Sequence, residues 1–406
     1  MSKIKIRCFG PVKEGFSEKN GWLDIRKVTV FVGNQGSGKS TVAKLVSAFT
    51  WMEKALFRGD YDKEWFEKKN RFKNQFLPYH RLENYLQPDT GIEYQGDVYS
   101  IKYRDGAMSI SETGGTYPLP QIMYVPAERN FLTYIKGAKE LKLSSEALQE
   151  FNTEYIHAKN DLKATARLPI GNTDVEYSKQ HDNLYLKGDG YKIELTEASS
   201  GFQSFVPQYL VSKYLADSVK THSDNKEAMS AEERSRFKED AKKIWDNPSL
   251  TDEQKRLALS ALSSKFNKTA FVNIVEEPEQ NLFPSSQWMM LQSLLEFNNG
   301  TPGNKLVITT HSPYLISYLT LLVKAGQLAP IVTATQEKEL GKIISLKSIV
   351  NPADLSVYEL DEITGSIHAL ETLNELPSDE NALNKELEES NELFAKLLEI
   401  QKKPAV

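Results

Sequence analysis

A glycine-rich loop near the N-terminus carries the residue types and the spacing that most clearly predict chemistry. It fits the pattern G-x-x-x-x-G-K-[ST] and consists of Gly33, Asn34, Gln35, Gly36, Ser37, Gly38, Lys39 and Ser40. Glycines allow tight turns that bring backbone N–H groups close to phosphate oxygens. The lysine can reach the β and γ phosphates of a nucleotide, and the last serine hydroxyl can sit on Mg²⁺. The loop therefore predicts a site for nucleotide phosphates.

The segments on either side of the loop agree with this prediction. Residues 28–32 form a short β-branched, apolar run that is typical of a buried strand. Residues 41–49, which start with Thr41, carry apolar side chains at helical spacing. An ordinary glycine-rich turn is a poor alternative, because the full pattern and both flanks match. We expect a strand, a phosphate-binding loop and a helix.

Two adjacent carboxylates, Glu276 and Glu277, follow another apolar run at 271–275. If this strand and the strand at 28–32 are parallel neighbours, the acids lie near the phosphate loop, at the carboxyl edge of the sheet. One carboxylate can then hold the water shell of a metal ion, and the other can accept a proton from an attacking water. Without the loop, the pair would read as a charged strand end.

Two more apolar runs end in polar residues. His311 follows the run at 305–310, and although a lone histidine is usually structural, a strand beside the phosphate loop favours a functional one. The run at 122–125 is followed by Glu128 and Arg129. These two side chains could equally belong to a ligand site or form a structural ion pair.

A small polar cluster precedes the apolar-periodic segment that begins at Phe205. It includes Ser199, Ser200, Gly201 and Gln203. Ser200 is a candidate helix cap, and the free N–H groups of a capped helix can face an anion. Most capped helices bind nothing, so this cluster alone is weak evidence.

The composition predicts a soluble, cytoplasmic protein with no membrane partner. The chain has 406 residues, 40% of them hydrophobic, and contains neither an eighteen-residue apolar run nor a secretory apolar block. Its single cysteine, Cys8, excludes an internal disulfide and a Cys-only metal site. The formal net charge of −5 gives no overall basic footprint for nucleic acid, although a local patch is compatible with it.

Residues 51–80 mix aromatic and basic side chains, a combination that can hold a nucleic-acid backbone and stack its bases. Acidic residues are interspersed among the basic ones. We therefore favour an amphipathic helix that packs on the core through its aromatic side chains.

The predicted fold class is α/β, with a mixed sheet core, a β-rich N-terminal lobe and helical insertions. The N-terminal lobe covers 1–135 and includes a hairpin that turns at Asp105-Gly106. An insertion at 136–190 separates it from a second lobe at 191–350, within which 217–268 is a charged helical insertion.

The remaining part, 351–406, is predicted to hold an edge strand at 357–360 and a charged helix from Asp379. One face of this helix carries Leu383, Leu387, Phe394, Leu397 and Leu398. Such a stripe suits docking either on another subunit or on the chain's own domain.

Taken in order, these segments resemble the ABC-type ATPases, in particular the soluble branch that contains SMC, RecF-like and overcoming-lysogenization-defect (OLD) proteins. Residues 33–40 match the Walker A motif, 199–203 look like the LSGGQ signature, and 271–277 look like Walker B. Residues 279–283 fall at the D-loop, and His311 matches the switch histidine. The resemblance covers roughly 1–60, 120–132, 192–215 and 269–325.

The resemblance implies a homodimer or higher homo-oligomer that binds ATP and Mg²⁺ in sites shared between protomers. Lys39 would bind phosphate, Ser40 and Glu276 would serve the Mg²⁺ shell, and Glu277 would position the water. His311 would sense the γ-phosphate. The signature residues Ser199, Ser200, Gly201 and Gln203 would close the site in trans.

Three departures from the family pattern are visible. Glu276 stands where an aspartate is usual, Phe202 replaces a signature glycine, and no clear Q-loop glutamine follows Val125. The last departure leaves the residue that couples the two lobes unidentified.

The chain is similar to the ATPase component of antiphage systems such as PARIS. The long segment between Gln203 and Glu276 argues against a transporter ATPase, and the chain lacks the heptad arms of SMC proteins and the Toprim acids of OLD nucleases. This similarity implies a sensor and scaffold that controls a separate nuclease of the Toprim type and responds to a phage trigger protein. A DNA-repair or DNA-processing ATPase that binds nucleic acid is the alternative.

Overall fold

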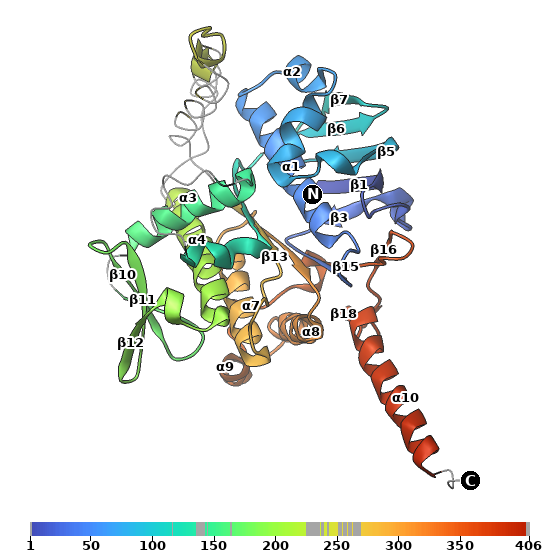
Figure 1. Cartoon of the computed structure of the whole chain (residues 1–406), viewed down its shortest axis with the longest axis vertical. Helices are drawn as coiled ribbons and strands as arrows, with labels where there is room; N and C mark the ends of the chain where they lie inside the picture. The colour runs from blue at the N-terminus through green and yellow to red at the C-terminus, as the bar shows by residue number, and fades with distance from the viewer. Residues whose placement is uncertain are drawn as a thin grey trace.

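The protein is described by a computed structural model, which covers residues 2–402 except 116, 135–142, 144, 163–164 and most of 225–268 (Figure 1). Within 225–268 it describes only 236, 239–241, 243–250, 254, 258 and 262. Most of the helical insertion expected at 217–268 therefore lies outside the described residues. None of the helices in the described part is long and apolar enough to cross a membrane.

A seven-stranded mixed sheet forms the centre of the molecule. Its order is β2-β16-β15-β4-β14-β13-β8. The strands are β2 (Gly15–Phe16), β4 (Val28–Gly33), β8 (Pro120–Val125), β13 (Ala270–Glu276), β14 (Lys305–Thr310), β15 (Leu355–Leu360) and β16 (Ser366–Ala369). The five strands from β15 to β8 are parallel, whereas β16 is antiparallel to β15. All residues of β4, β8 and β13 are buried, as expected for strands covered on both faces. The apolar run at 122–125 suggests a central strand, but β8 is the last strand of the sheet, and its burial comes from the layers on its two faces.

The two faces of this sheet are covered by different layers. Along β4, Val30 and Val32 belong to one hydrophobic core, and Phe31 between them belongs to the other. The Phe31 side contains α1 (Lys39–Arg58) and the five-stranded sheet. The opposite side contains α4 (Ser200–Asp224), α7 (Pro284–Asn299) and α8 (Pro313–Leu328).

The five-stranded antiparallel sheet forms the β-rich N-terminal lobe, in the order β3-β1-β5-β6-β7. Its strands are β1 (Ser2–Phe9), β3 (Leu23–Ile25), β5 (Leu86–Gln95), β6 (Tyr99–Arg104) and β7 (Ala107–Glu112). Asp105 and Gly106 join β6 to β7 with φ of 53° and 76°, so the predicted hairpin is confirmed. With the mixed sheet and the helical layers, this lobe confirms the predicted fold class.

Residues 51–80 pack by their aromatic side chains, as favoured, but not as one helix. Gly59, with a φ of 78°, ends α1, and the short α2 (Lys63–Glu67) follows. Trp65, Phe66 and Phe72 lie in the core beneath the N-terminal sheet. This burial accounts for the aromatic residues without a nucleic-acid partner.

The segment between β8 and α4 contains a helix and a small separate sheet. The helix is α3 (Glu146–Asp161), and the antiparallel sheet has the order β12-β11-β10-β9. Its strands are β9 (Ala166–Arg167), β10 (Asp174–Ser178), β11 (Asn183–Gly188) and β12 (Tyr191–Glu194).

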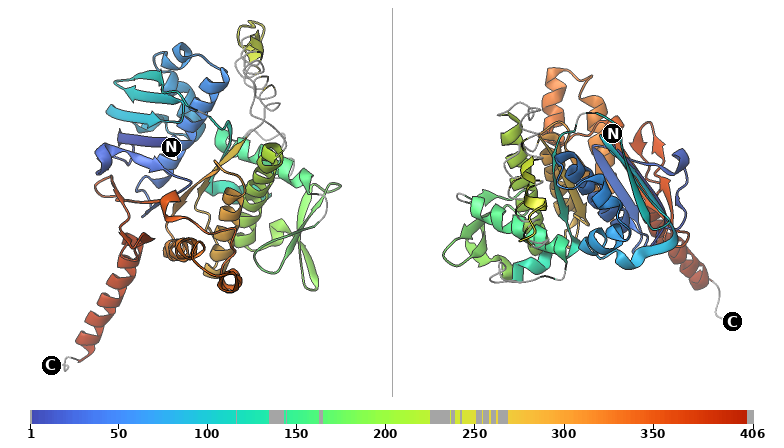
Figure 2. Two further views of the ribbon diagram at one scale, coloured as in Figure 1. Left: turned by 180° about the vertical axis from the view of Figure 1, so that it is seen from behind. Right: turned by 90° about the horizontal axis from the view of Figure 1, so that it is seen from above.

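The C-terminal part corrects one prediction. The strand expected at an edge, β15, is paired on both sides, with β4 and with β16. The later strand β16 folds back beside β15 and covers the side that would otherwise be an edge. After α9 (Ala334–Ile343), β17 (Thr372–Leu373) and β18 (Leu376–Pro377), the chain ends in α10 (Ala382–Lys402), which projects away from the body (Figures 1 and 2).

Candidate nucleotide-binding site

The phosphate loop lies between β4 and α1, as predicted, and its glycines are required by the backbone. Gly36 and Gly38 have φ of 80° and 101°, a region that side-chain-bearing residues rarely adopt. A Cβ on Gly33 would lie 2.4 Å from the carbonyl oxygen of Leu360, at the end of the adjacent strand β15. The loop is thus held tightly against β15.

Lys39 is folded back onto its own loop. Its Nζ donates to the carbonyl oxygens of Gly33, at 2.8 Å, and Asn34, at 2.7 Å. Burial lowers the pKa of Lys39, while the attraction of Glu277 acts in the opposite direction. Within the described residues, the ammonium therefore has carbonyl partners and forms no salt bridge with a carboxylate, which leaves it suited to an anion.

The loop also contains an unused hydroxyl. The buried Oγ of Ser37 makes no hydrogen bond to the described residues. Together with the left-handed glycines and the buried ammonium of Lys39, this orphaned hydroxyl fits a phosphate group bound in the loop.

Strand order brings the predicted acids and the histidine to the same sheet edge as the loop. The strands β4 and β13 are parallel, but β14 lies between them, so they are not neighbours. Glu276 ends β13, Glu277 follows it, and His311 follows β14. His311 therefore comes from the strand that separates the phosphate loop from the acids.

Glu276 is buried and already has protein donors on both carboxylate oxygens. Its Oε1 accepts from the hydroxyl of Tyr124, and its Oε2 accepts from the backbone N–H of Ala127 at 3.1 Å. Lys44 of α1 lies 3.9 Å from Oε1. These contacts fix the carboxylate between β8 and α1, and the Tyr124 partner gave no signal in the sequence.

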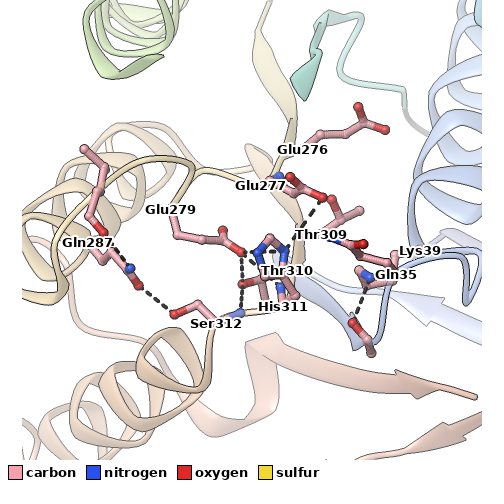
Figure 3. A network of polar contacts seen from close by, with 12 residues as sticks. Gln35, Lys39, Glu276, Glu277, Glu279, Gln287, Thr309, Thr310, His311 and Ser312 are labelled. Carbon is pink, nitrogen blue, oxygen red and sulfur yellow. Dashed lines mark hydrogen bonds and ion pairs between the residues drawn. The ribbon is translucent and has the colours of Figure 1, made fainter. Parts of the chain in front are cut away.

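Glu277 is held in an unusual backbone conformation, with a φ of 41°. Its N–H donates to the carbonyl oxygen of Thr309 at 2.9 Å, across to β14. Its carboxylate oxygen lies 3.7 Å from Nδ1 of His311, and both side chains are partly exposed (Figure 3). A strained backbone at this point is typical of functional sites.

Glu279 accepts hydrogen bonds from Thr310 and His311, a role that the sequence did not predict. Its Oε1 accepts from the hydroxyl of Thr310 at 2.7 Å and from the N–H of His311 at 3.0 Å (Figure 3). The other oxygen, Oε2, has no partner among the described residues. Burial raises the pKa of Glu279, and the two hydrogen bonds oppose that rise.

Arg129 joins the acidic strand end to helix α4. The fully buried guanidinium donates to the carbonyl oxygens of Glu276 and Glu277, each at 2.7 Å, and to that of Ser204 at 3.1 Å. Burial lowers the pKa of Arg129 to about 10, so it stays charged at neutral pH. Glu128 is exposed, and no salt bridge within the described part of the chain joins it to Arg129, so the ion-pair interpretation is wrong.

The residues of the serine cluster lie at the start of α4, away from the loop. The helix begins at Ser200, and the carbonyl of Ser199 accepts from the N–H of Gln203 at 3.1 Å. Ser199 rather than Ser200 therefore precedes the helix, which corrects the predicted cap by one residue. The hydrogen bonds between described residues include none from Ser199, Ser200 or Gly201 to the phosphate loop.

The same turn packs against the segment that follows Glu277. A Cβ on Gly201 would lie 2.8 Å from the carbonyl oxygen of Asn281, so only glycine fits there. The side-chain Nε2 of Gln203 donates to the carbonyl oxygens of Thr196 and Ala198, at 2.9 and 3.0 Å. Gln203 thus stabilises its own turn, whereas Ser199 and Ser200 remain exposed.

The donor set suits Mg²⁺ only in combination with phosphate oxygens. Within the described residues no group of three or more His, Cys, Asp or Glu side chains could hold a metal ion. Mg²⁺ in phosphate sites commonly uses one or two protein oxygens together with phosphates and waters. Ser40, which is half-buried at the start of α1, and the carboxylate of Glu276 fit that limited role.

Comparisons with known proteins give only a distant likeness. No family model matches the chain, and no curated protein matches it. Among solved structures, the SMC head domain from Thermotoga maritima is 10% identical, with a TM-score of 0.35, and the alignment covers 91% of this chain and 98% of that one. A dimeric ATP-binding cassette in a post-hydrolysis state, bound to ADP and Pi, is 12% identical, with a TM-score of 0.28 and coverage of 92% and 100%. At these values neither likeness bears on activity.

Proposed function

We propose that the chain is a Mg²⁺-dependent ATPase that binds ATP through residues 33–41. The observation that carries this proposal is the meeting, at one sheet edge, of a phosphate loop with a buried ammonium and a strained, half-exposed glutamate beside a histidine. A phosphate loop alone would support binding. The carboxylate of Glu277 adds a proton acceptor, which hydrolysis requires.

Each side chain has a distinct task in this proposal. Lys39 exchanges its two loop carbonyls for phosphate oxygens, and Ser37 offers its free hydroxyl. Ser40 and Glu276 face the Mg²⁺ shell, with Tyr124 keeping the Glu276 carboxylate oriented. Bound Mg²⁺ supplies charge neutralisation at the phosphates. Glu277 accepts the proton of the attacking water, and His311 contacts the terminal phosphate.

The replacement of Glu277 by glutamine tests the assignment. The amide keeps the shape of the side chain but loses the proton acceptor, so we expect ATP binding to persist and turnover to fall about 10²- to 10⁴-fold. Lys39→Ala should instead lose ATP binding. Binding is measured with a fluorescent ATP analogue and turnover by phosphate release.

The exposed Glu337 of α9 provides a matched control, since Glu337→Gln should change neither measurement. Wild-type turnover in Glu277→Gln would show that another group accepts the proton. Normal ATP binding in Lys39→Ala would remove the phosphate loop from the site.

We further propose that two copies share each site, with Ser200 and Gly201 of one copy closing on the nucleotide of the other. No hydrogen bond between described residues joins Ser200 or Gly201 to the phosphate loop of the same chain, which supports a role in trans. The segment 277–281 connects the end of β13 to the start of α4. Ser204 of α4 donates to the side-chain oxygen of Gln280, in this segment, at 3.0 Å. A second copy that binds at the start of α4 would therefore also contact the segment that carries Glu277.

At the cellular level we propose a cytoplasmic sensor and scaffold that holds a separate nuclease and releases it when a phage protein arrives. The sequence supports this by lacking a nuclease acid set after His311. Co-purification with the product of the neighbouring gene tests it, and Glu277→Gln should retain that product more firmly than wild type. Failure of both forms to bind it would contradict the scaffold role without affecting the ATPase assignment.

A DNA-driven ATPase is the second candidate, and a basic cavity on the N-terminal sheet favours it. The cavity has a volume of about 380 Å³ and is lined by four cations and two carboxylates, Lys5, Arg7, Lys102, Arg104, Asp89 and Glu93. Gly91 lies between Arg7 and Arg104 in the sheet register and leaves open space between them.

Duplex DNA separates the two candidates. If the protein is a DNA-driven ATPase, duplex DNA stimulates its turnover. The double variant Arg7→Gln, Arg104→Gln should then lose the stimulation, and the salt dependence of its DNA binding should fall by the equivalent of about two phosphate contacts. Turnover that ignores DNA favours the scaffold. Arg167→Gln, on the small sheet, is the control.

A further inference from the structure

Among the described residues, the first turn of helix α10 carries its contacts with the body of the molecule. The backbone N–H of Ala382 donates to a carboxylate oxygen of Glu359, in β15, and the buried Asn381 caps the helix by accepting from the N–H of Asn384 at 3.1 Å. Leu383 packs against the central core. Beyond this turn the helix points away from the rest of the molecule in both side views (Figures 1 and 2).

The outer half of α10 exposes five large apolar side chains. Leu393, Phe394, Leu397, Leu398 and Ile400 are 60%, 62%, 62%, 40% and 64% exposed. At 100° per residue they share one side of the helix, whereas Ala395 lies on the other. An apolar stripe of this size on a helix free of its own domain needs a partner, because an isolated helix of this length is only marginally stable.

The charges of the helix are divided between its halves. Residues 382–392 contain four glutamates and one lysine, and residues 393–402 contain two lysines and one glutamate. The helix is therefore complementary in charge to a reversed copy of itself. A parallel copy would instead bring the acidic halves together and the basic ends together.

We propose that α10 pairs in antiparallel fashion with α10 of a second copy of this chain. The helices cross where Phe394 of one copy packs on Leu397 of the other, which buries both apolar stripes. The contact involves the outer half of the helix and needs no nucleotide.

The mass of the full chain without nucleotide tests the pairing. Light scattering across a dilution series should give twice the 46.0 kDa of one chain at high concentration. Phe394→Glu with Leu397→Glu should reduce the mass to that of one chain at every concentration. Ala395→Glu, which adds the same charge on the other side of the helix, should leave the dimer intact.

Cysteine cross-linking tests the orientation. In a Cys8→Ser background, Phe394→Cys chains mixed with Leu397→Cys chains should form a mixed disulfide, because these two positions face each other in the antiparallel pair. Since both changes lie on the exposed helix, ATP binding serves as a check that each variant is folded.

Three results would overturn the proposal. A wild-type chain that stays monomeric at all concentrations would mean that α10 serves a different partner. A dimer unaffected by the Phe394 and Leu397 changes would place the contact elsewhere. Disulfide formation between two copies of Phe394→Cys in a Cys8→Ser background, with none between Phe394→Cys and Leu397→Cys chains, would show a parallel arrangement. None of these results depends on ATP hydrolysis.

Discussion

At the scale of single residues, the carboxyl of Glu279 should give the protein a pH-dependent stability. Its pKa is raised by burial, so the folded state binds a proton that the unfolded state releases near the ordinary value of 4.5. The stabilising contribution is full below that value and is lost as the pH rises through the folded-state pKa.

Glu279→Gln should remove this dependence. The amide oxygen can still accept from Thr310 and from the N–H of His311, and no buried charge remains. We expect the difference between the melting temperatures of the variant and the wild type to increase by on the order of 2 °C, in favour of the variant, as the pH rises from about 5 to 8. Differential scanning fluorimetry measures the melting temperatures, with Glu337→Gln as the control. If the melting temperatures of Glu279→Gln and the wild type change in parallel with pH, Glu279 does not titrate in this range.

The sequence predicted residues whose role depends on local pattern and missed those whose role depends on distant partners. The phosphate loop was predictable because its glycines, Lys39 and Ser40 are contiguous. The sequence assigned Glu279 to the D-loop but did not indicate its hydrogen bonds, because its partners Thr310 and His311 lie at the end of β14. Arg129 stayed ambiguous for the same reason, since its acceptors belong to residues about 75 and 147 positions away.

At the scale of elements, Arg129 holds the end of β13 and helix α4 in one unit. Arg129→Met leaves several buried carbonyl oxygens without a donor, so we expect it to lower the free energy of unfolding by about 3 kcal/mol or more. Arg129→Lys keeps the charge but lacks the planar fork of donors, and the loss should be intermediate. Urea unfolding measures both.

The neighbouring Glu128 is the control for this prediction. It is exposed, so Glu128→Gln should stay within about 0.5 kcal/mol of the wild type. Equal stability of Arg129→Met and wild type would mean that water replaces the guanidinium and that β13 and α4 are not coupled through it.

Elements were predictable where hydrophobic periodicity was strong. The strands at 28–32, 122–125, 271–275 and 305–310 were correctly predicted because nearly all their residues are apolar or buried. Burial alone did not reveal that the strand at 122–125 lies at the edge of the sheet. The place of β15 was not, because alternating burial looks the same on an edge strand and on an internal strand that lies near the sheet margin. The start of α4 was missed by one residue, since Ser199 and Ser200 are equally good caps.

At the scale of the whole molecule, the shared-site proposal predicts complementation between two inactive chains. Ser200→Arg should block the partner's site and Lys39→Ala its own, so a mixed dimer keeps one intact site. With random mixing, roughly a quarter of the wild-type turnover should return. Phosphate release is measured on the mixture and on each variant alone.

The control for complementation is Ser200→Ala, which should stay active because it adds no bulk. If mixed dimers form, as shown by differently tagged chains, and no turnover returns, the Ser200 turn does not act in trans. Full activity of Ser200→Arg alone would lead to the same conclusion.

The pairing of β4 on both sides has a consequence for how the protein is made. Residues 28–33 can complete their sheet only after 305–310 and 355–360 are available. At about 5 to 20 residues per second, a ribosome needs roughly 15 to 65 s to synthesise the intervening chain. The phosphate loop therefore emerges long before the strands that flank it, so the nascent chain cannot complete the surroundings of this loop until residues 355–360 have been made.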